Sequence, residues 1–392
     1  MRPLDGVTVV SLEQAVAAPY ATRQLADLGA RVIKIERPDG GDFARHYDES
    51  VLGQSSYFVW LNRSKESLTL DVKHAAGQAI LHELLAGADV FVHNLGPGAS
   101  TRLGVAAGPL CARYPRLVHC TVSGYGTTGP WADRKAYDLL VQCETGLVSL
   151  TGTPEVTAKV GISVADIAAG MYAYSGVLTG LLRRANTGAG SAFEVSLFEA
   201  LAEWMGQPAY YTRYGGEQPA RAGAQHATIA PYGPYTTGDG DTVVLAVQNE
   251  REWVALCRLV LGDEAVARDQ RFATNPARVR NRDALNALFA KRFAELDTEQ
   301  ARDLLREAGV ANGRMNTVPD FLAHPVLAER GRWRSVGSPG GDIDALLPPV
   351  TFAGEEPRLG PVPAAGEHTD AILRALGHTD EDIAGLRAAR TV

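Results

Sequence analysis

The sequence predicts an α/β protein in which helices cover a parallel sheet, followed along the chain by a smaller α/β domain. Two observations lead to this fold class. Between residues 7 and 123, short apolar runs rich in β-branched residues alternate with helical patterns, which is typical of parallel strands joined by helices. The chain of 392 residues is also too long for one simple core, so two domains are expected.

The first predicted unit is a β-α-β motif at the N-terminus. A β-branched run at residues 7–12 predicts a buried strand, residues 20–28 form a helical pattern that Gly29 ends, and residues 31–35 predict the next strand. The connection is right-handed by default. This motif lacks G-x-G-x-x-G, so an NAD-dependent dehydrogenase is disfavoured.

The alternation continues with strands expected at 68–72, 89–93 and 117–123, a helix at 75–85 and a short helix around Thr101. Ligands of such sheets bind beyond the carboxyl ends of the strands. The loops at those ends are 13–19, 36–42, 94–98 and 124–130.

The stretch 160–184 predicts a long helix with many small residues. Large residues at helical spacing predict its buried face, and small ones allow another backbone to approach closely: Ile167, Met171, Tyr174, Val177 and Leu181 are the large ones. Ser163 and Asp166 fit the S/T-x-x-D capping pattern, which places the helix start near Ser163.

Asp166 is the one carboxylate near the start of this helix. At the positive end of the helix dipole it is expected to stay ionised. It fits two roles: a helix cap, which is the commoner role for such a residue, or a nucleophile towards an acyl carbon.

A second, smaller domain is expected after a stretch rich in Gly, Pro, Thr and Tyr at 214–241, which is interpreted as a connector. A strand is expected at 242–247, with helices at 250–261, 283–293 and 298–308. A second Pro/Gly stretch, 337–349, precedes terminal helices at 370–376 and 380–390.

Composition excludes several classes of function. The net charge of -7 argues against a nucleic-acid or acidic-membrane binder. The N-terminus lacks a signal peptide and no apolar run is long enough to span a membrane, so a cytoplasmic protein is expected. Four scattered cysteines favour buried thiols in a reducing compartment over disulfides: Cys111, Cys120, Cys143 and Cys257.

Catalytic motifs of other classes are absent. There is no G-x-S-x-G elbow, no Walker loop and no histidine spacing typical of a metal site, so no metal is expected. Basic residues do gather at the predicted ligand edge, and converging Arg and Lys side chains suit a phosphorylated ligand. They are Arg37, Lys65, Lys73, Arg102 and Lys135.

A series of segments along the chain matches one known family: residues 3–45, 62–67, 70–73, 94–98, 123–126, the stretch around Asp166, and 366–370. In these segments the sequence resembles the class III coenzyme A transferases, a superfamily that includes formyl-CoA transferase, mesaconyl-CoA transferase and the α-methylacyl-CoA racemases. These pieces follow the family's order and spacing over nearly the whole chain.

The resemblance implies that Asp166 is the catalytic nucleophile, which passes through an aspartyl anhydride and an aspartyl-CoA thioester. It implies coenzyme A as cosubstrate, with no tightly bound cofactor. Backbone N–H groups near Val16 and Ala17 are candidates to stabilise oxyanions. The implied CoA contacts are Val16, Ala17, Arg37, Leu70, Lys73, Asn94, Arg102, Lys135 and Tyr137.

The implied fold is a large Rossmann-like domain built from both chain ends, residues 1–215 and 331–392. The connector and small α/β domain then occupy 216–330. The resemblance further implies an interlocked homodimer that binds neither nucleic acid nor membrane.

The acyl substrate is expected to be a small dicarboxylate such as mesaconate or succinate. The residues that favour it are polar groups able to face an acyl carboxylate: Gln14, Arg45, His46 and His226. The loop 223–231 replaces the glycine-rich loop of formyl-CoA transferase, which makes formyl and oxalate unfavourable substrates.

Two alternatives remain open. An α-methylacyl-CoA racemase would carry a histidine before the aspartate at position 138, where this chain has Tyr137, and would then lack one general base. A non-catalytic CoA-binding protein would not need Asp166.

Overall fold

The computed structural model describes residues 1–392 as two compact units. The first comprises residues 1–145, 161–205 and 328–392, and the second comprises 146–160 and 206–327. Both chain ends therefore belong to the first unit. Residues 146–160 and 206–215 group with the second unit, whereas the sequence places them in the large domain. Whether the units fold as separate domains, and whether the chain forms an interlocked dimer, stay predictions.

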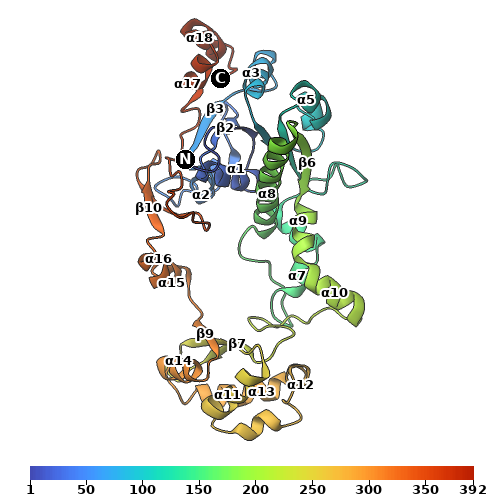
Figure 1. Cartoon of the computed structure of the whole chain (residues 1–392), viewed down its shortest axis with the longest axis vertical. Helices are drawn as coiled ribbons and strands as arrows, with labels where there is room; N and C mark the ends of the chain where they lie inside the picture. The colour runs from blue at the N-terminus through green and yellow to red at the C-terminus, as the bar shows by residue number, and fades with distance from the viewer. The chain divides into compact units, whose positions relative to one another are not determined.

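The first unit is built on a six-stranded, all-parallel sheet (Figure 1). Its order, β3-β2-β1-β4-β5-β6, is that of doubly wound dinucleotide-binding folds. The strands are β1 (Thr8–Leu12), β2 (Arg31–Glu36), β3 (Lys65–Thr69), β4 (Val90–His93), β5 (Val118–Ser123) and β6 (Ser191–Ser196). The order reverses between β1 and β4, and ligands of such sheets bind where the order reverses.

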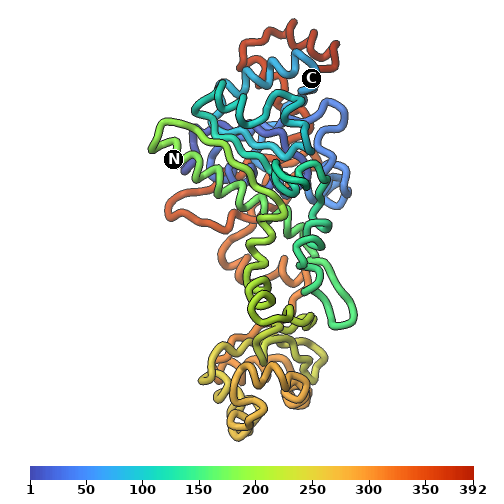
Figure 2. The backbone as a smooth tube through the Cα atoms, turned by 90° about the vertical axis from the view of Figure 1, so that its right-hand side faces the viewer, coloured from blue at the N-terminus to red at the C-terminus, as the bar shows by residue number.

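One face of this sheet is covered by α3 (Ala75–Ala86), α5 (Ala107–Arg113), α17 (Thr369–Ala375) and α18 (Asp380–Ala388). Buried residues of these helices form one hydrophobic core with Val10, Ile33 and Phe91 of the sheet. Figures 1 and 2 show the C-terminal helices, in red, beside α3. The end of the chain thus helps to cover the sheet that its beginning forms.

The opposite face carries α1 (Ala17–Asp27) and α8 (Val164–Thr187), which pack against each other. Gly180 of α8 lies against Val118 of β5. The next residue of β5, His119, lies in register with Phe91 of β4, which belongs to the hydrophobic core on the first face. The remaining helices of this unit are α2 (Ser56–Asn62), α4 (Ala99–Arg102), α6 (Asp138–Glu144) and α9 (Leu197–Trp204), with the 3-10 turn η1 (Phe43–His46) and the hairpin β10 (Trp333–Val336) and β11 (Ile343–Leu346).

Helix α8 is buried mainly through its small residues, and of the five large residues expected on its buried face only Val177 is buried. The buried residues are Ala165, Ala168, Ala169, Gly170, Ala173, Val177 and Gly180. Met171 is exposed, and Ile167, Tyr174 and Leu181 are only partly buried. The reason is close packing: a Cβ on Gly170 would lie 2.7 Å from the Ala17 carbonyl oxygen of α1.

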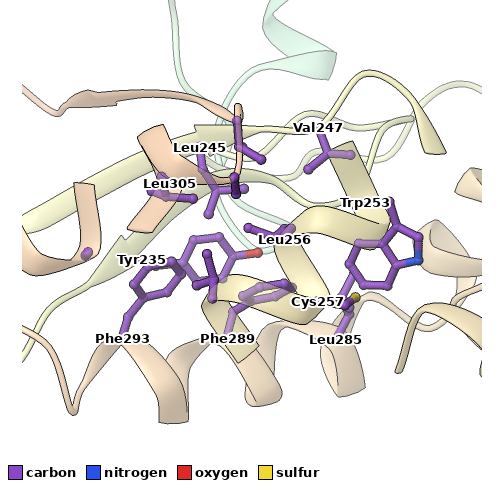
Figure 3. Packing of buried hydrophobic residues seen from close by; sticks show 14 of the residues in the cluster. Tyr235, Leu245, Val247, Trp253, Leu256, Cys257, Leu285, Phe289, Phe293 and Leu305 are labelled. Atoms are coloured by element: carbon purple, nitrogen blue, oxygen red, sulfur yellow. The ribbon is translucent and has the colours of Figure 1, made fainter. Parts of the chain in front are cut away.

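The second unit contains the antiparallel sheet β7 (Tyr232–Thr236), β8 (Thr242–Ala246) and β9 (Ala311–Arg314). Its core joins Tyr235, Trp253, Phe289 and Phe293 (Figure 3). Its other elements are α7 (Leu147–Leu150), α10 (Gly206–Gly215), α11 (Glu250–Leu256), the π-turn η2 (Cys257–Leu261), the 3-10 turn η3 (Glu264–Arg268), α12 (Asn275–Arg280), α13 (Arg282–Phe293), α14 (Thr298–Glu307) and α15 (Val318–Leu322), while α16 (Pro325–Glu329) crosses the boundary of the units.

Three expectations about local structure are wrong. The stretch 214–241 is not only a connector, because β7 belongs to the core sheet of the second unit. The strand expected at 68–72 lies at Lys65–Thr69. The cysteines are all unpaired, but Cys143 is exposed and Cys111 is partly buried.

No helix combines the length and low polarity that crossing a bilayer requires.

Replacing Gly170 by alanine should destabilise the protein, by about 1–3 kcal/mol, because the new methyl group overlaps the Ala17 carbonyl oxygen and Tyr20. The matched control is Gly385→Ala in α18, where nothing lies within 4 Å of the added Cβ. There alanine should stabilise the helix by about 0.5–1 kcal/mol. Urea unfolding midpoints compare the two, and an unchanged midpoint for Gly170→Ala would contradict the packing.

Candidate active site

The loop between β1 and α1 lies at the point where the strand order reverses. Because β1 and β4 are parallel neighbours, the residues that follow them meet at one edge. Asn94 holds the loop there: its Oδ1 accepts from Gln14 N–H at 2.9 Å, and its Nδ2 donates to the Gln14 carbonyl at 2.8 Å. Asn94 therefore fixes the backbone at this edge, whatever else it contacts.

Helix α1 begins directly after this loop with no side-chain cap. Val16 is its N-cap residue and Ala17 its first residue. The N–H groups of Val16 and Ala17 donate to no acceptor in the protein. A helix N-terminus with unpaired N–H groups attracts negative charge. The expected oxyanion donors are thus unpaired, and both residues are buried.

Asp166 lies in the first turn of α8, and its position relative to α1 follows from Gly170. Residues four apart share one face of a helix, and Gly170 contacts the Ala17 carbonyl oxygen. In this topology α1 leaves the carboxyl edge of the sheet, and α8 starts at the same edge before returning to β6. The first turns of both helices, and with them Asp166 and the loop 13–17, therefore come together.

The cap of α8 comes from a residue that the capping pattern did not predict. Ser163 is the N-cap residue, but its side chain makes no capping hydrogen bond. Instead, Asp138 of α6 accepts from Ala165 N–H through Oδ1 at 2.8 Å, and its Oδ2 accepts from Gln142 Nε2 at 2.7 Å. Asp166 is therefore not needed as the cap of its own helix.

The charge state expected for Asp166 is corrected by its surroundings. Burial of the carboxyl group and the nearby Asp138 carboxylate raise the pKa of Asp166 to about 7. Desolvation and a like charge both disfavour the ionised form, and here they outweigh the dipole of α8. Shifts of this kind are common at functional sites.

Tyr47 and Asp42 are two neighbours that the sequence interpretation missed. Burial, and then the carboxylates of Asp42 and Asp166, raise the pKa of Tyr47 to about 12. Its ring packs edge-on against Tyr57, with 5.5 Å between centroids. The only sequence signal was the run Gly40-Gly41-Asp42 at a ligand-edge loop, where a turn brings polar residues towards the site.

The residues expected to bind CoA lie around the carboxyl edge of the sheet. Each follows a strand of the parallel sheet or lies in the loop after β5, and Lys73, Arg102, Lys135 and Tyr137 are exposed. Arg37 is also exposed and donates through Nε and Nη2 to the Gly41 carbonyl, both at 3.2 Å. Leu70 is 1% exposed and belongs to the hydrophobic core, and its N–H donates to the Glu36 carbonyl at 2.8 Å. Their roles stay predictions.

The residues expected to face the acyl carboxylate are less uniform. Arg45 is structural, because its guanidinium pairs with Glu36 through two bonds of 2.8 Å and stacks on Phe58. His46 is exposed, with Nε2 3.1 Å from the Gly40 carbonyl oxygen. His226 belongs to the second unit, where its ring stacks on Tyr232. Gln14 is held through its backbone, which leaves its side chain partly exposed.

A cavity of about 180 Å³ lies at the other end of α1 and contains none of the predicted site residues. Asp27, Leu28 and Phe352 contribute to its wall. Its arginines mostly bind protein: Arg332 donates to the Leu347 and Pro348 carbonyls, and Arg2 to the Glu356 carbonyl. No group of three or more potential ligand side chains is arranged for a metal ion.

Comparison with known proteins identifies the class of this site. A model of CoA-transferase family III matches residues 4–369. The chain belongs to CoA-transferase family III. It is therefore an enzyme that uses CoA thioesters, and the resemblance drawn from the sequence motifs is confirmed.

Relatives of this family III CoA-transferase cover nearly the whole chain. Succinyl-CoA:glutarate CoA-transferase of Mus musculus is 32% identical over 97% of this chain and 88% of its own length. Acetyl-CoA:oxalate CoA-transferase of Acetobacter aceti is 36% identical over 84% of each chain. A crystal structure of a CAIB/BAIF family protein from Brucella suis is 35% identical, with a TM-score of 0.83 over 96% of this chain and 99% of that one.

The raised pKa of Asp166 predicts a measurable effect on stability. The folded state holds this proton up to about pH 7, whereas the unfolded chain releases it near pH 4, so ionising Asp166 costs folding free energy as the pH rises between these values. Asp166→Asn should therefore be more stable than the native protein at pH 8, by about 1–3 kcal/mol. Denaturant unfolding at pH 4 and pH 8 measures this; an equal pH dependence of both proteins would contradict the raised pKa.

Proposed function

We propose that this enzyme moves CoA from an acyl-CoA thioester to a small dicarboxylate, with Asp166 as the covalent nucleophile. The assignment to Asp166 is supported by its surroundings. Asp166 is a partly buried carboxylate that does not cap its own helix, and it lies in the helix turn next to the unpaired N–H groups of Val16 and Ala17.

The proposed reaction stores the thioester energy on the protein. A carboxylate oxygen of Asp166 attacks the thioester carbonyl, the C–S bond breaks, and a mixed anhydride and CoA thiolate form. The thiolate then attacks the Asp166 carbonyl carbon and releases the donor acid as its carboxylate, which leaves an aspartyl-CoA thioester. The acceptor carboxylate reverses these steps and leaves as the new acyl-CoA.

The environment of Asp166 suits this chemistry. With a pKa of about 7, a large share of the group is ionised at neutral pH, and the same desolvation that raises the pKa makes the carboxylate more reactive than one in water. Each attack places negative charge on a carbonyl oxygen. Donors that are already in place, here the N–H groups of Val16 and Ala17, stabilise such a charge without reorganisation.

The CoA portion is proposed to lie along the exposed basic residues of the carboxyl edge. Arg37, Lys73 and Arg102 suit the phosphates and the nucleotide end, because guanidinium and ammonium groups pair with phosphate oxygens. Lys135 and Tyr137 are assigned to the pantetheine. The side chain of Asn94 completes the proposed contacts, whereas Leu70 belongs to the hydrophobic core.

The dicarboxylate class rests on the relatives. The mouse and Acetobacter proteins are named for glutarate and oxalate, both dicarboxylates, and succinyl is one of the named donor groups. Gln14 and His46 are proposed to contact the distal carboxylate. No structural observation favours racemisation, which would need a second base at the position of Tyr137.

The mechanism predicts a covalent intermediate that accumulates when no acceptor is present. Incubation with succinyl-CoA should give a CoA adduct on the peptide that carries Asp166, as peptide mass spectrometry would detect. Asp166→Ala should show none. An adduct on the peptide of the exposed thiol Cys143 would contradict the assignment and indicate thiol chemistry instead.

The substrate class predicts which acceptors are used. With succinyl-CoA as donor, glutarate and mesaconate should be converted to their CoA thioesters at least tenfold faster than acetate, propionate or butyrate. Chromatographic separation of the product thioesters gives the rates. Turnover with monocarboxylates alone would contradict the dicarboxylate assignment while leaving the CoA-transferase class intact.

A further inference from the structure

Ala15 has an unusual backbone conformation in the loop that precedes α1. Its φ of 61° lies in the left-handed region, which is unfavourable for a residue with a side chain. Such a conformation persists only where its surroundings hold it. The peptide N–H of Ala15 donates to Oδ1 of Asp42 at 3.2 Å, so Asp42 is the group that holds it.

Asp42 is itself fixed from two sides. It is 2% exposed, and its Oδ1 also accepts from Ala44 N–H at 2.9 Å. Its Oδ2 accepts from the ammonium of Lys34 at 2.8 Å. Lys34 is fully buried in β2, so solvent does not hydrate this charge pair.

Lys34 also reaches the residue that begins the loop. Its Nζ donates to the Glu13 carbonyl at 3.3 Å, and the Glu13 carboxylate is bound at 2.6 Å by Lys65 and at 2.6 Å by Thr22. Glu13 and Ala15 are thus held by buried polar partners, and Gln14 is held by the partly buried Asn94. The residues immediately after them are the unpaired donors Val16 and Ala17.

This arrangement is costly if its purpose is stability alone. Buried ion pairs seldom stabilise a fold more than apolar residues of the same volume would, because each charge loses its hydration. The charges instead fix the backbone conformation of the loop before α1. A left-handed residue changes the direction of the chain, so the conformation of Ala15 sets where the next two N–H groups point.

We propose that Asp42 is a positioning residue of the transfer reaction: held by Lys34, its carboxylate fixes Ala15 and thereby aims the Val16 and Ala17 N–H groups at the oxyanions formed at Asp166. The proposal rests on the proposed function of Asp166. Asp42 acts through the backbone and does not itself touch the reacting atoms.

The test is Asp42→Asn, which keeps the size of the side chain but removes the charge that Lys34 holds. The kcat of succinyl transfer should fall about 10- to 100-fold, since loss of an oxyanion donor typically costs a factor of 100–1,000 and misaiming it costs part of this. The KM for succinyl-CoA should change less than threefold. The rate of adduct formation on Asp166 should fall with kcat.

The matched control is Asp27→Asn at the far end of α1. Asp27 is 1% exposed and pairs with Arg63 through bonds of 2.9 and 2.7 Å and with Arg23 at 3.2 Å, so it is an equally buried and paired carboxylate. Both variants should lower the melting temperature, but only Asp42→Asn should slow adduct formation. Equal losses of rate in the two variants would reduce Asp42 to a structural role.

A second substitution tests whether Asp42 acts through Ala15. Glycine adopts a positive φ at no steric cost. The double variant Ala15→Gly/Asp42→Asn should therefore have a kcat at least threefold higher than that of Asp42→Asn alone. No recovery would overturn the route through Ala15. Should Asp42→Asn fail to fold, Lys34→Met/Asp42→Asn removes both charges together and should give the same loss of kcat.

The two proposals fail in different ways. A native enzyme that forms no adduct on Asp166 would refute the proposed function. A native enzyme that forms the adduct, with an Asp42→Asn variant that forms it at the native rate, would refute only the positioning role of Asp42.

Discussion

The candidate site depends on one close contact, that of α1 with α8 at Gly170. A Cβ at this position would overlap the Ala17 carbonyl oxygen, so the backbones of the two helices touch where both begin. Because Asp166 lies one turn before Gly170, this contact brings a carboxylate and an uncapped helix N-terminus together at one edge. Around it, Asn94 and Asp42 hold the loop before α1, and Asp138 helps to raise the pKa of the buried Asp166.

Most of the large unit could be predicted from the sequence because its strands are buried on both faces. β1 and β4 are largely apolar, β2 and β5 combine polar with β-branched residues, and each of the four lies within about two residues of its expected position. β3 and β6 were misplaced or missed for a physical reason: Lys65 and Ser67 are buried polar residues of β3, and β6 alternates polar and apolar residues. In the second unit, β7 was hidden because Gly233 and Pro234 lie inside a strand.

The sequence could name the residues of the candidate site but not their electrostatics. Asp166 could be named from the family motifs, but its pKa depends on Asp138, which is 28 residues earlier and approaches only in the folded chain. For the same reason Arg45 could not be recognised as structural before its pairing with Glu36 was seen. Hydrophobic periodicity says where a chain is buried; it does not say which charges meet there.

The burial of the Lys34 network also separates two kinds of electrostatic interaction in this enzyme. Dissolved ions screen charges that face water over about 8 Å at physiological ionic strength, and they screen buried pairs much less. Lys34 and Asp42 are inaccessible, whereas Lys73, Arg102 and Lys135 are exposed. Added salt should therefore weaken the attraction for an anionic cosubstrate while leaving the geometry of the loop before α1 unchanged, so that capture of the cosubstrate and the chemical step respond differently to the ionic medium.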